Sequence, residues 1–164
     1  MDIEKVDIRY SKLEDEKDLI HWLQDPENNK WFPFSEEKEI KESVKNWIGY
    51  SKYKASLTAT INDKPIAVGT LFLMPYRKVS HLCMFYLIVD KDFRRKKIGT
   101  SMLKNLLNLA KSYFYLESVY IEIFEGCDML YLLKKFDFKE IAYQRYYVKN
   151  NDKFSARILL EHRF

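Results

Sequence analysis

The sequence has few of the residues that break or cross-link a chain. Its 164 residues include only 4 glycines, 4 prolines and 2 cysteines, which argues against a collagen-like, low-complexity or disulfide-stapled protein. Cys83 and Cys127 form no Cys-x-x-Cys pair, and the first residues lack the apolar stretch of a secretory signal. We therefore interpret both cysteines as free thiols of a reducing compartment. No apolar run approaches the roughly 18 residues of a membrane span, so we expect a cytoplasmic protein without membrane association.

The residues that are abundant favour a globular domain. Hydrophobic residues make up 47% of the chain and aromatic residues 16%, and the formal net charge is +4. This composition indicates one folded domain spanning residues 1–164. The mild positive charge permits an anionic ligand. A basic run at residues 94–97 would suit a nucleic acid, but no helix-turn-helix, zinc or RNP pattern accompanies it. We expect no nucleic-acid partner and no metal site.

Hydrophobic periodicity predicts a mixed fold. Alternating or continuous apolar runs predict seven strands, near residues 6–10, 53–61, 66–74, 81–90, 118–124, 139–148 and 153–162. Helical spacing of apolar residues predicts four helices, near residues 13–25, 36–50, 98–113 and 128–136. We expect an α/β (α+β) fold with a mixed, mostly antiparallel central sheet of about six or seven strands and about four flanking helices.

The densest positive charge lies in "DFRRKKIGTSML", residues 92–103. It follows the most apolar predicted strand and opens the longest predicted helix. Ligands of open α/β sheets bind at the carboxyl ends of strands, and free N–H groups at a helix N-terminus attract phosphate. Gly99 would allow a ligand close to the backbone, and the Thr100 hydroxyl would add a donor. The stretch therefore predicts a site for an anionic ligand.

The same stretch resembles the acetyl-CoA-binding motif of the GNAT superfamily of N-acetyltransferases. That motif is a (Gln/Arg)-x-x-Gly-x-(Gly/Ala) loop after a strand, and here it reads Arg94-Arg95-Lys96-Lys97-Ile98-Gly99. A second stretch, "YLLKKFDFKEI", resembles the L-Y-x-x-x-G-F element of the family, and the order of predicted elements fits a GNAT-like sheet over nearly the whole chain. The resemblance implies an acetyl-CoA-dependent N-acetyltransferase that moves the acetyl group directly to a primary amine.

The resemblance also assigns the acetyl-CoA site. A backbone N–H near Leu87, exposed at a bulge of the central strand, would bind the thioester oxygen, while the following residues would pair with the pantetheine arm and the loop would hold the pyrophosphate. The implied cofactor-binding residues are Leu87, Ile88, Val89, Arg94, Arg95, Lys96, Lys97, Ile98, Gly99 and Thr100. Lys97 stands where the family has its first glycine.

The catalytic residues are less directly implied. The family tyrosine that protonates the departing thiolate maps to Leu133, and the glycine before Phe138 is Asp137. Tyr131 lies two residues earlier, roughly 200° around a helix. Candidate proton-transfer residues are Tyr131, His81 and Glu122. Each also has a purely structural interpretation: groove lining for the tyrosine, a surface position for the histidine and a sheet-surface carboxylate for the glutamate.

The acceptor side of the site is predicted from three aromatics. Trp31, Phe32 and Phe34 follow the first predicted helix, where the family shapes its acceptor pocket, although they could equally pack as a loop. We expect a small-molecule or peptide amine as acceptor, and the resemblance is also compatible with a homodimer. The departures at Lys97, Leu133 and Asp137 favour one alternative function, a catalytically weak acyl-CoA-binding sensor or regulatory module.

Overall fold

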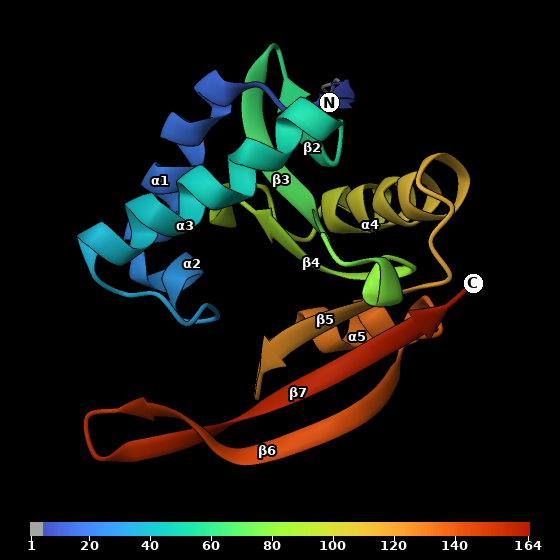
Figure 1. Ribbon diagram of the computed structural model, residues 1–164. Helices are drawn as coiled ribbons and strands as arrows, with labels where there is room; N and C mark the ends of the chain where they lie inside the picture. Colours follow the sequence, from blue (N-terminus) through green and yellow to red (C-terminus); the bar gives the residue numbers. More distant parts are fainter. Residues whose placement is uncertain (1–4) are drawn as a thin grey trace.

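The computed structural model describes residues 5–164 (Figure 1). Seven strands form one sheet in the order β1-β2-β3-β4-β5-β7-β6. All neighbours are antiparallel except β4 and β5, which are parallel. The strands are β1 (Val6–Tyr10), β2 (Ser56–Ile61), β3 (Lys64–Leu73), β4 (Leu82–Val89), β5 (Ser118–Phe124), β6 (Lys139–Asn150) and β7 (Lys153–Arg163). The predicted mixed, mostly antiparallel sheet is confirmed.

Helices cover both faces of this sheet (Figure 1). One face carries α1 (Glu16–Gln24), α2 (Pro26–Asn29) and α3 (Glu37–Gly49), and the other carries α4 (Ile98–Asn108) and α5 (Met129–Lys135). The four-residue α2 is the helix that the sequence did not predict. It begins at Pro26, a residue suited to the first helical position, and the side chain of Asp25 accepts a hydrogen bond from the N–H of Glu27 at 3.0 Å. None of the helices within residues 5–164 has the length and apolarity needed to span a membrane.

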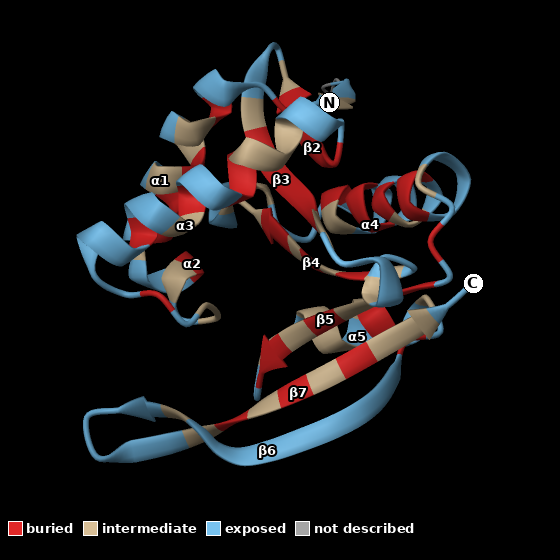
Figure 2. Cartoon of the chain, viewed as in Figure 1, coloured by how far each residue is buried: buried red, intermediate tan, exposed pale blue. Residues whose placement is uncertain are grey.

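Side chains of β4 alternate between two hydrophobic cores, as the two-residue period of a strand requires. Phe85 and Leu87 pack in the core beneath α4 and α5, whereas Ile88 packs in the core beneath α1 and α3. All three are nearly completely buried, and the buried centre of the sheet contrasts with the exposed edge strand β6 in Figure 2. This two-sided burial explains why the sequence of β4 is a continuous apolar run.

The parallel neighbours β4 and β5 part soon after they meet. They pair only at Leu82–Ser118, Cys83–Val119 and Met84–Tyr120. Beyond this point β4 stays with β3 and β5 stays with β7. A wedge-shaped gap between the two strands follows from this pairing.

The backbone of β4 presents alternate N–H groups to the gap. The N–H of Asp90 donates to the carbonyl of Ile66 on the β3 side at 2.8 Å. In an antiparallel ladder such bonds recur at every second residue, so Ile88 also faces β3, and the N–H groups of Leu87 and Val89 point to the gap. The predicted bulge in β4 is wrong, because its register with β3 is unbroken from Cys83 to Val89. The gap arises from the divergence of β5 instead.

Gly69 on β3 allows α4 to approach the sheet closely. A methyl group at this position would overlap Cδ1 of the buried Leu106 on α4. We predict that Gly69→Ala lowers the free energy of unfolding by about 1–3 kcal/mol, because the core must shift to admit it. Urea denaturation measures this value. The matched control is Gly49→Ala in α3, where no atom lies within 4 Å of the added carbon; equal loss of stability in both variants would contradict the packing argument.

Candidate active site

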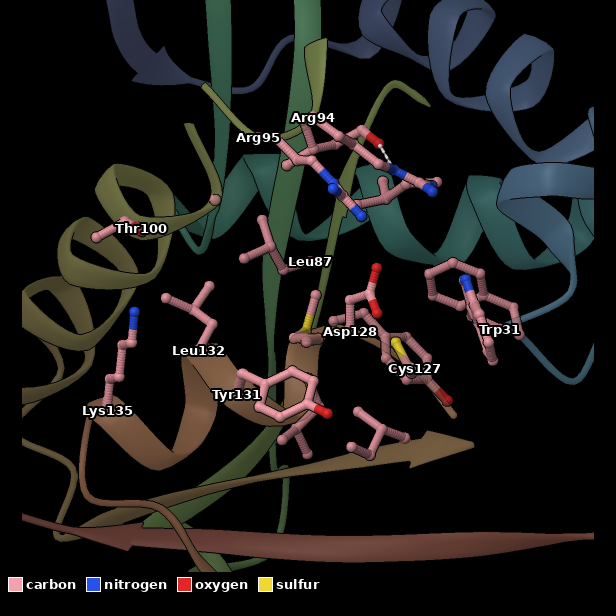
Figure 3. A pocket seen from close by; sticks show the side chains of 18 of the residues that line it. Trp31, Leu87, Arg94, Arg95, Thr100, Cys127, Asp128, Tyr131, Leu132 and Lys135 are labelled. Carbon is pink, nitrogen blue, oxygen red and sulfur yellow. Dashed lines mark hydrogen bonds between the residues drawn. The ribbon is translucent and has the colours of Figure 1, made fainter. Parts of the chain in front are cut away.

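A cleft of about 450 Å³ occupies the gap between β4 and β5. Its walls come from these two strands, the loop before α4, helix α5 and the segment after α2 (Figure 3). The lining residues are Trp31, Phe32, Tyr86, Leu87, Ile88, Val89, Arg94, Arg95, Lys97, Gly99, Thr100, Ile121, Glu122, Ile123, Cys127, Asp128, Met129, Tyr131, Leu132 and Lys135. Most residues predicted for the site therefore meet around one cavity.

The loop from Arg94 to Lys97 has an unusual backbone. Arg95 and Lys97 both adopt left-handed conformations, with φ of 60° and 63°. This region is costly for residues with a side chain and natural for glycine, which gives a physical reason for glycine at the position of Lys97 in the related motif. The N–H of Ser101 donates to the carbonyl of Lys97 at 3.1 Å and begins the hydrogen bonding of α4. The preceding N–H groups of the first turn have no acceptor within the helix.

Five of the seven predicted loop residues line the cleft. They are Arg94, Arg95, Lys97, Gly99 and Thr100. Lys96 and Ile98 do not: the Nζ of Lys96 lies 5.4 Å from the ring centre of Phe93, and Ile98 is buried in the core. A methyl group on Gly99 would make only ordinary contacts, 3.6 Å from Leu132 and 3.8 Å from Val89. The fold itself would therefore accept alanine there, and glycine keeps space free within the cleft.

Lys135 adds a cation that the sequence did not reveal. It comes from the last turn of α5 and lies beside the same cleft as Thr100 (Figure 3). With Arg94, Arg95 and Lys97 it gives this part of the cleft four positive side chains. Together with the helix N-terminus, these charges suit an anionic ligand such as a phosphate.

Glu122 is the only acidic side chain that the cleft receives from the sheet within the described residues. Its neighbours Ile121 and Ile123 face the α4 side of the sheet, so Glu122 faces the opposite side. The side chain is 10% exposed, its Oε2 lies 3.6 Å from Nη1 of Arg157, and Oε1 has no hydrogen-bond partner among residues 5–164. Burial raises the pKa of Glu122 above its ordinary value, against the opposing charge of Arg157.

Helix α5 turns different side chains to the core and to the cleft. Leu133, at the position of the family tyrosine, is fully buried in the core, whereas Tyr131 lines the cleft and is 71% exposed. Figure 3 shows Tyr131 directed into the cavity from α5. Burial also raises the pKa of the Cys127 thiol, so this cysteine lines the cleft in its protonated form and is a poor nucleophile.

The predicted acceptor aromatics divide between cleft and core. Trp31 and Phe32 line the cleft, but Phe34 does not; it is 8% exposed and stacks on Phe32 with 5.6 Å between ring centres. Phe32 also packs edge-on against Tyr86 of β4 at 5.6 Å. Burial, with the nearby charge of Glu122, raises the pKa of Tyr86, whose hydroxyl therefore stays protonated beside the cleft.

The structure does not bring His81 to this site. His81 is exposed and precedes the first residue of β4, where its carbonyl accepts a hydrogen bond from the N–H of Glu117 at 2.7 Å. The cleft begins at Tyr86 on the same strand. Five residues of extended strand separate these positions by about 16 Å. His81 is therefore too far from the cleft to transfer a proton there.

Comparison with known proteins finds solved acetyltransferase structures that share the fold of this chain. A search of the sequence against curated proteins finds no match. Among solved structures, a GNAT-family acetyltransferase from Streptococcus pneumoniae superimposes with a TM-score of 0.79 at 14% identity, covering 98% of this chain and 100% of that one. The yncA protein from Salmonella typhimurium, solved with its cofactor acetyl-CoA, gives 0.81 at 10% identity over 96% and 93% of the two chains.

A third solved structure has the same fold. The ribosomal-protein-S18-alanine N-acetyltransferase from Escherichia coli gives a TM-score of 0.73 at 16% identity, covering 96% of this chain and 92% of that one. At these identities the three structures establish the fold. Residues 17–138, about three-quarters of the chain, match the acetyltransferase (GNAT) family in sequence. This protein belongs to the GNAT family of acetyltransferases.

Proposed function

We propose that the protein is an N-acetyltransferase that moves an acetyl group from acetyl-CoA to a primary amine of a small molecule or peptide. The observation that carries this proposal is the buried oxygen of Glu122, which has no hydrogen-bond partner among the described residues and lies at a cleft whose other wall is cationic. A buried, unpaired carboxylate oxygen is costly unless a ligand satisfies it. An ammonium or amine group is a suitable partner.

The residues of the cleft fit acetyl-CoA, which supplies the activated acetyl group. The N–H groups of Leu87 and Val89 are two residues apart and face the gap, so Leu87 can serve the thioester oxygen while Val89 pairs with an amide of the extended pantetheine arm. The cationic side chains and the first turn of α4 suit the pyrophosphate. Ile121, Ile123 and Leu132 supply apolar walls between these polar parts.

The acetyl transfer then assigns a role to Glu122. An acceptor amine must be neutral before its nitrogen can attack the acetyl carbon. The Glu122 carboxylate accepts the proton that the amine gives up, and its burial makes it a stronger base than an exposed glutamate. The N–H of Leu87 donates to the thioester oxygen, where negative charge develops during the attack.

Breaking the carbon–sulfur bond leaves a thiolate that needs a proton. Tyr131 is the hydroxyl-bearing side chain of α5 that lines the cleft, and we assign it the transfer of this proton to the sulfur. The products are an acetylated amine and free CoA. Trp31 and Phe32 form the apolar wall against which the acceptor binds.

Lys97 and Lys96 allow a matched test of the cofactor site. Both are lysines of the same loop, but only Lys97 lines the cleft. We predict that Lys97→Gln weakens CoA binding about fivefold or more through loss of a charge-assisted contact, whereas Lys96→Gln changes it by less than about twofold. Isothermal titration calorimetry with CoA measures both values. Equal losses in the two variants would place the pyrophosphate elsewhere.

Glu122 has a testable effect on the pH dependence of turnover. A raised pKa means that the carboxylate binds its proton at a higher pH than the ordinary value of 4.5, so activity falls on acidification from that higher pH. We predict that Glu122→Gln lowers kcat by about 100-fold and removes this acidic limb. Steady-state rates measured upward from the ordinary carboxyl pKa of 4.5 provide the measurement. Glu140→Gln on exposed β6 is the control, and an unaltered pH profile for Glu122→Gln would exclude the assigned role.

Tyr131 is expected to affect catalysis more than binding. We predict that Tyr131→Phe lowers kcat by about tenfold or more and changes the Kd of CoA by less than about twofold, because the ring is kept and only the hydroxyl is lost. Thiol release measures kcat, and calorimetry measures the Kd. A normal catalytic rate would remove Tyr131 from the mechanism.

A panel of amines tests the proposed activity itself. The probes are an α-amino acid mixture, spermidine, kanamycin, a peptide with a free N-terminus and an N-blocked lysine peptide, each with acetyl-CoA. Thiol release above the rate without amine is the expected result for at least one class. Binding of CoA without turnover on every class would instead favour the sensor function.

A further inference from the structure

Two side-chain bridges connect the cofactor loop with the segment that carries the acceptor aromatics. In the first, the Nη2 of Arg94 donates to Oδ1 of Asn28, a residue 66 positions earlier, while the Nε of Arg94 donates to the carbonyl of Val89 at 3.2 Å. Arg94 thus joins the end of β4 to α2. Its guanidinium also lines the cleft (Figure 3).

The second bridge is an ion pair. Nζ of Lys91, in the turn after β4, lies 2.6 Å from Oδ2 of Asp25. The other carboxylate oxygen of Asp25 accepts a hydrogen bond from the N–H of Glu27 and caps α2. Both bridges therefore hold the same short helix against the segment that leads into the cofactor loop.

The aromatic segment is tied firmly to α2. The Nδ2 of Asn29 donates to the carbonyl of Phe34 at 2.7 Å, which closes residues 29–34 into a compact loop. At its far side, the Trp31 ring lies against the turn after β5, 3.7 Å from the position that a methyl group on Gly126 would take. The segment is thus held at two places, by the bond of Asn28 to Arg94 and by the contact of Trp31 with the turn at Gly126.

Asn28 is chemically suited to this place. It is 1% exposed, its Oδ1 accepts from Arg94, and its Nδ2 donates to the carbonyl of Trp22 at 3.0 Å. An aspartate could accept from Arg94 but could not donate to Trp22. A neutral amide also leaves the full charge of Arg94 available to an anion, whereas a carboxylate would compensate it. The N–H groups of Arg94 outside these two bonds can still bind a phosphate oxygen.

We propose that Asn28 is a positioning residue that couples the two halves of the site through Arg94. A pyrophosphate bound by the loop immobilises Arg94, and the bond from Arg94 to Asn28 then holds α2 and the wall formed by Trp31 and Phe32 in place. The acceptor wall is held more firmly when the cofactor loop is occupied, so the acceptor binds more tightly to the CoA-bound protein. This inference rests on the proposed function, because it needs the cofactor and acceptor at the assigned places.

Hydrogen–deuterium exchange of the whole protein, with CoA as the probe, tests the coupling. In the wild type we expect CoA to slow exchange in two segments, residues 94–101 and residues 26–34. In Asn28→Ala, CoA still protects residues 94–101, and its Kd stays within about threefold of wild type, but protection of residues 26–34 is lost. Glu27→Gln is the control on the same helix, because within residues 5–164 its side chain forms an ion pair with exposed Lys30 alone; it should behave as wild type.

A second variant covers the case in which Asn28→Ala does not fold. Asp25→Asn removes the ion pair with Lys91 but keeps a good capping side chain for α2. It should reduce the CoA-induced protection of residues 26–34 by about half or more while leaving residues 94–101 protected.

Asn28→Asp should weaken CoA binding about tenfold, since its carboxylate compensates the charge of Arg94. With the reactive amine of the panel, Asn28→Ala should raise the acceptor KM about fivefold or more and leave the acetyl-CoA KM within about threefold of wild type.

The outcomes separate this inference from the proposed function. Protection of residues 26–34 that persists in both Asn28→Ala and Asp25→Asn, or is missing in wild type while residues 94–101 are protected, overturns the coupling. An unchanged CoA affinity in Asn28→Asp overturns the charge argument for asparagine. If CoA protects neither segment of the wild type, the cofactor site itself is misplaced, and the proposed function fails first.

Discussion

β4 and β5 hydrogen-bond as parallel neighbours only from Leu82 to Met84, and beyond that point each strand belongs to a different partner. The fold thereby leaves the N–H groups of Leu87 and Val89 without a partner strand in the middle of a sheet. Backbone N–H groups that face a cleft are free to donate to a ligand, because no strand occupies them. The cleft between β4 and β5 follows from this parting of two strands.

Charge is distributed across the cleft in a way that suits two different reactants. The N-terminus of α4 and four cationic side chains border the cleft, together with the carboxylate of Asp128, whereas the buried carboxylate of Glu122 faces the side of the sheet opposite to α4. An anionic donor and an amine acceptor are therefore drawn to opposite ends of one passage. Arg94 belongs to both ends, since it lines the cleft and also bonds to Asn28 on the acceptor side.

Much of this arrangement could be predicted from the sequence, because the residues that indicate each strand, helix and loop are neighbours along the chain. The apolar run of β4, the amphipathic pattern of α4 and the basic loop between them predict a strand, a helix and an anion site from neighbouring residues alone. The family resemblance then places the loop on acetyl-CoA. Lys97 shows what a sequence pattern leaves out. The sequence shows a lysine where the family has glycine, but it does not show the left-handed backbone that explains the family's preference for glycine there.

The remainder depends on contacts between distant segments. Lys96 and Ile98 lie within the motif, yet one projects over Phe93 and the other enters the core, because a loop entering a helix turns successive side chains in different directions. Lys135 reaches the cleft only through the packing of α5. No local pattern could place it there, and none could predict the bond between Arg94 and Asn28 across 66 residues.

The gap between β4 and β5 is the place at which we expect the acetyl donor to bind. A crystal structure of the protein with acetyl-CoA bound tests this most directly. The expected result is a thioester oxygen at the N–H of Leu87, a pantetheine arm hydrogen-bonded to the backbone of Val89, and the pyrophosphate at the first turn of α4. Acetyl-CoA bound outside this gap, or a β5 strand that pairs with β4 through to Val89, would contradict it.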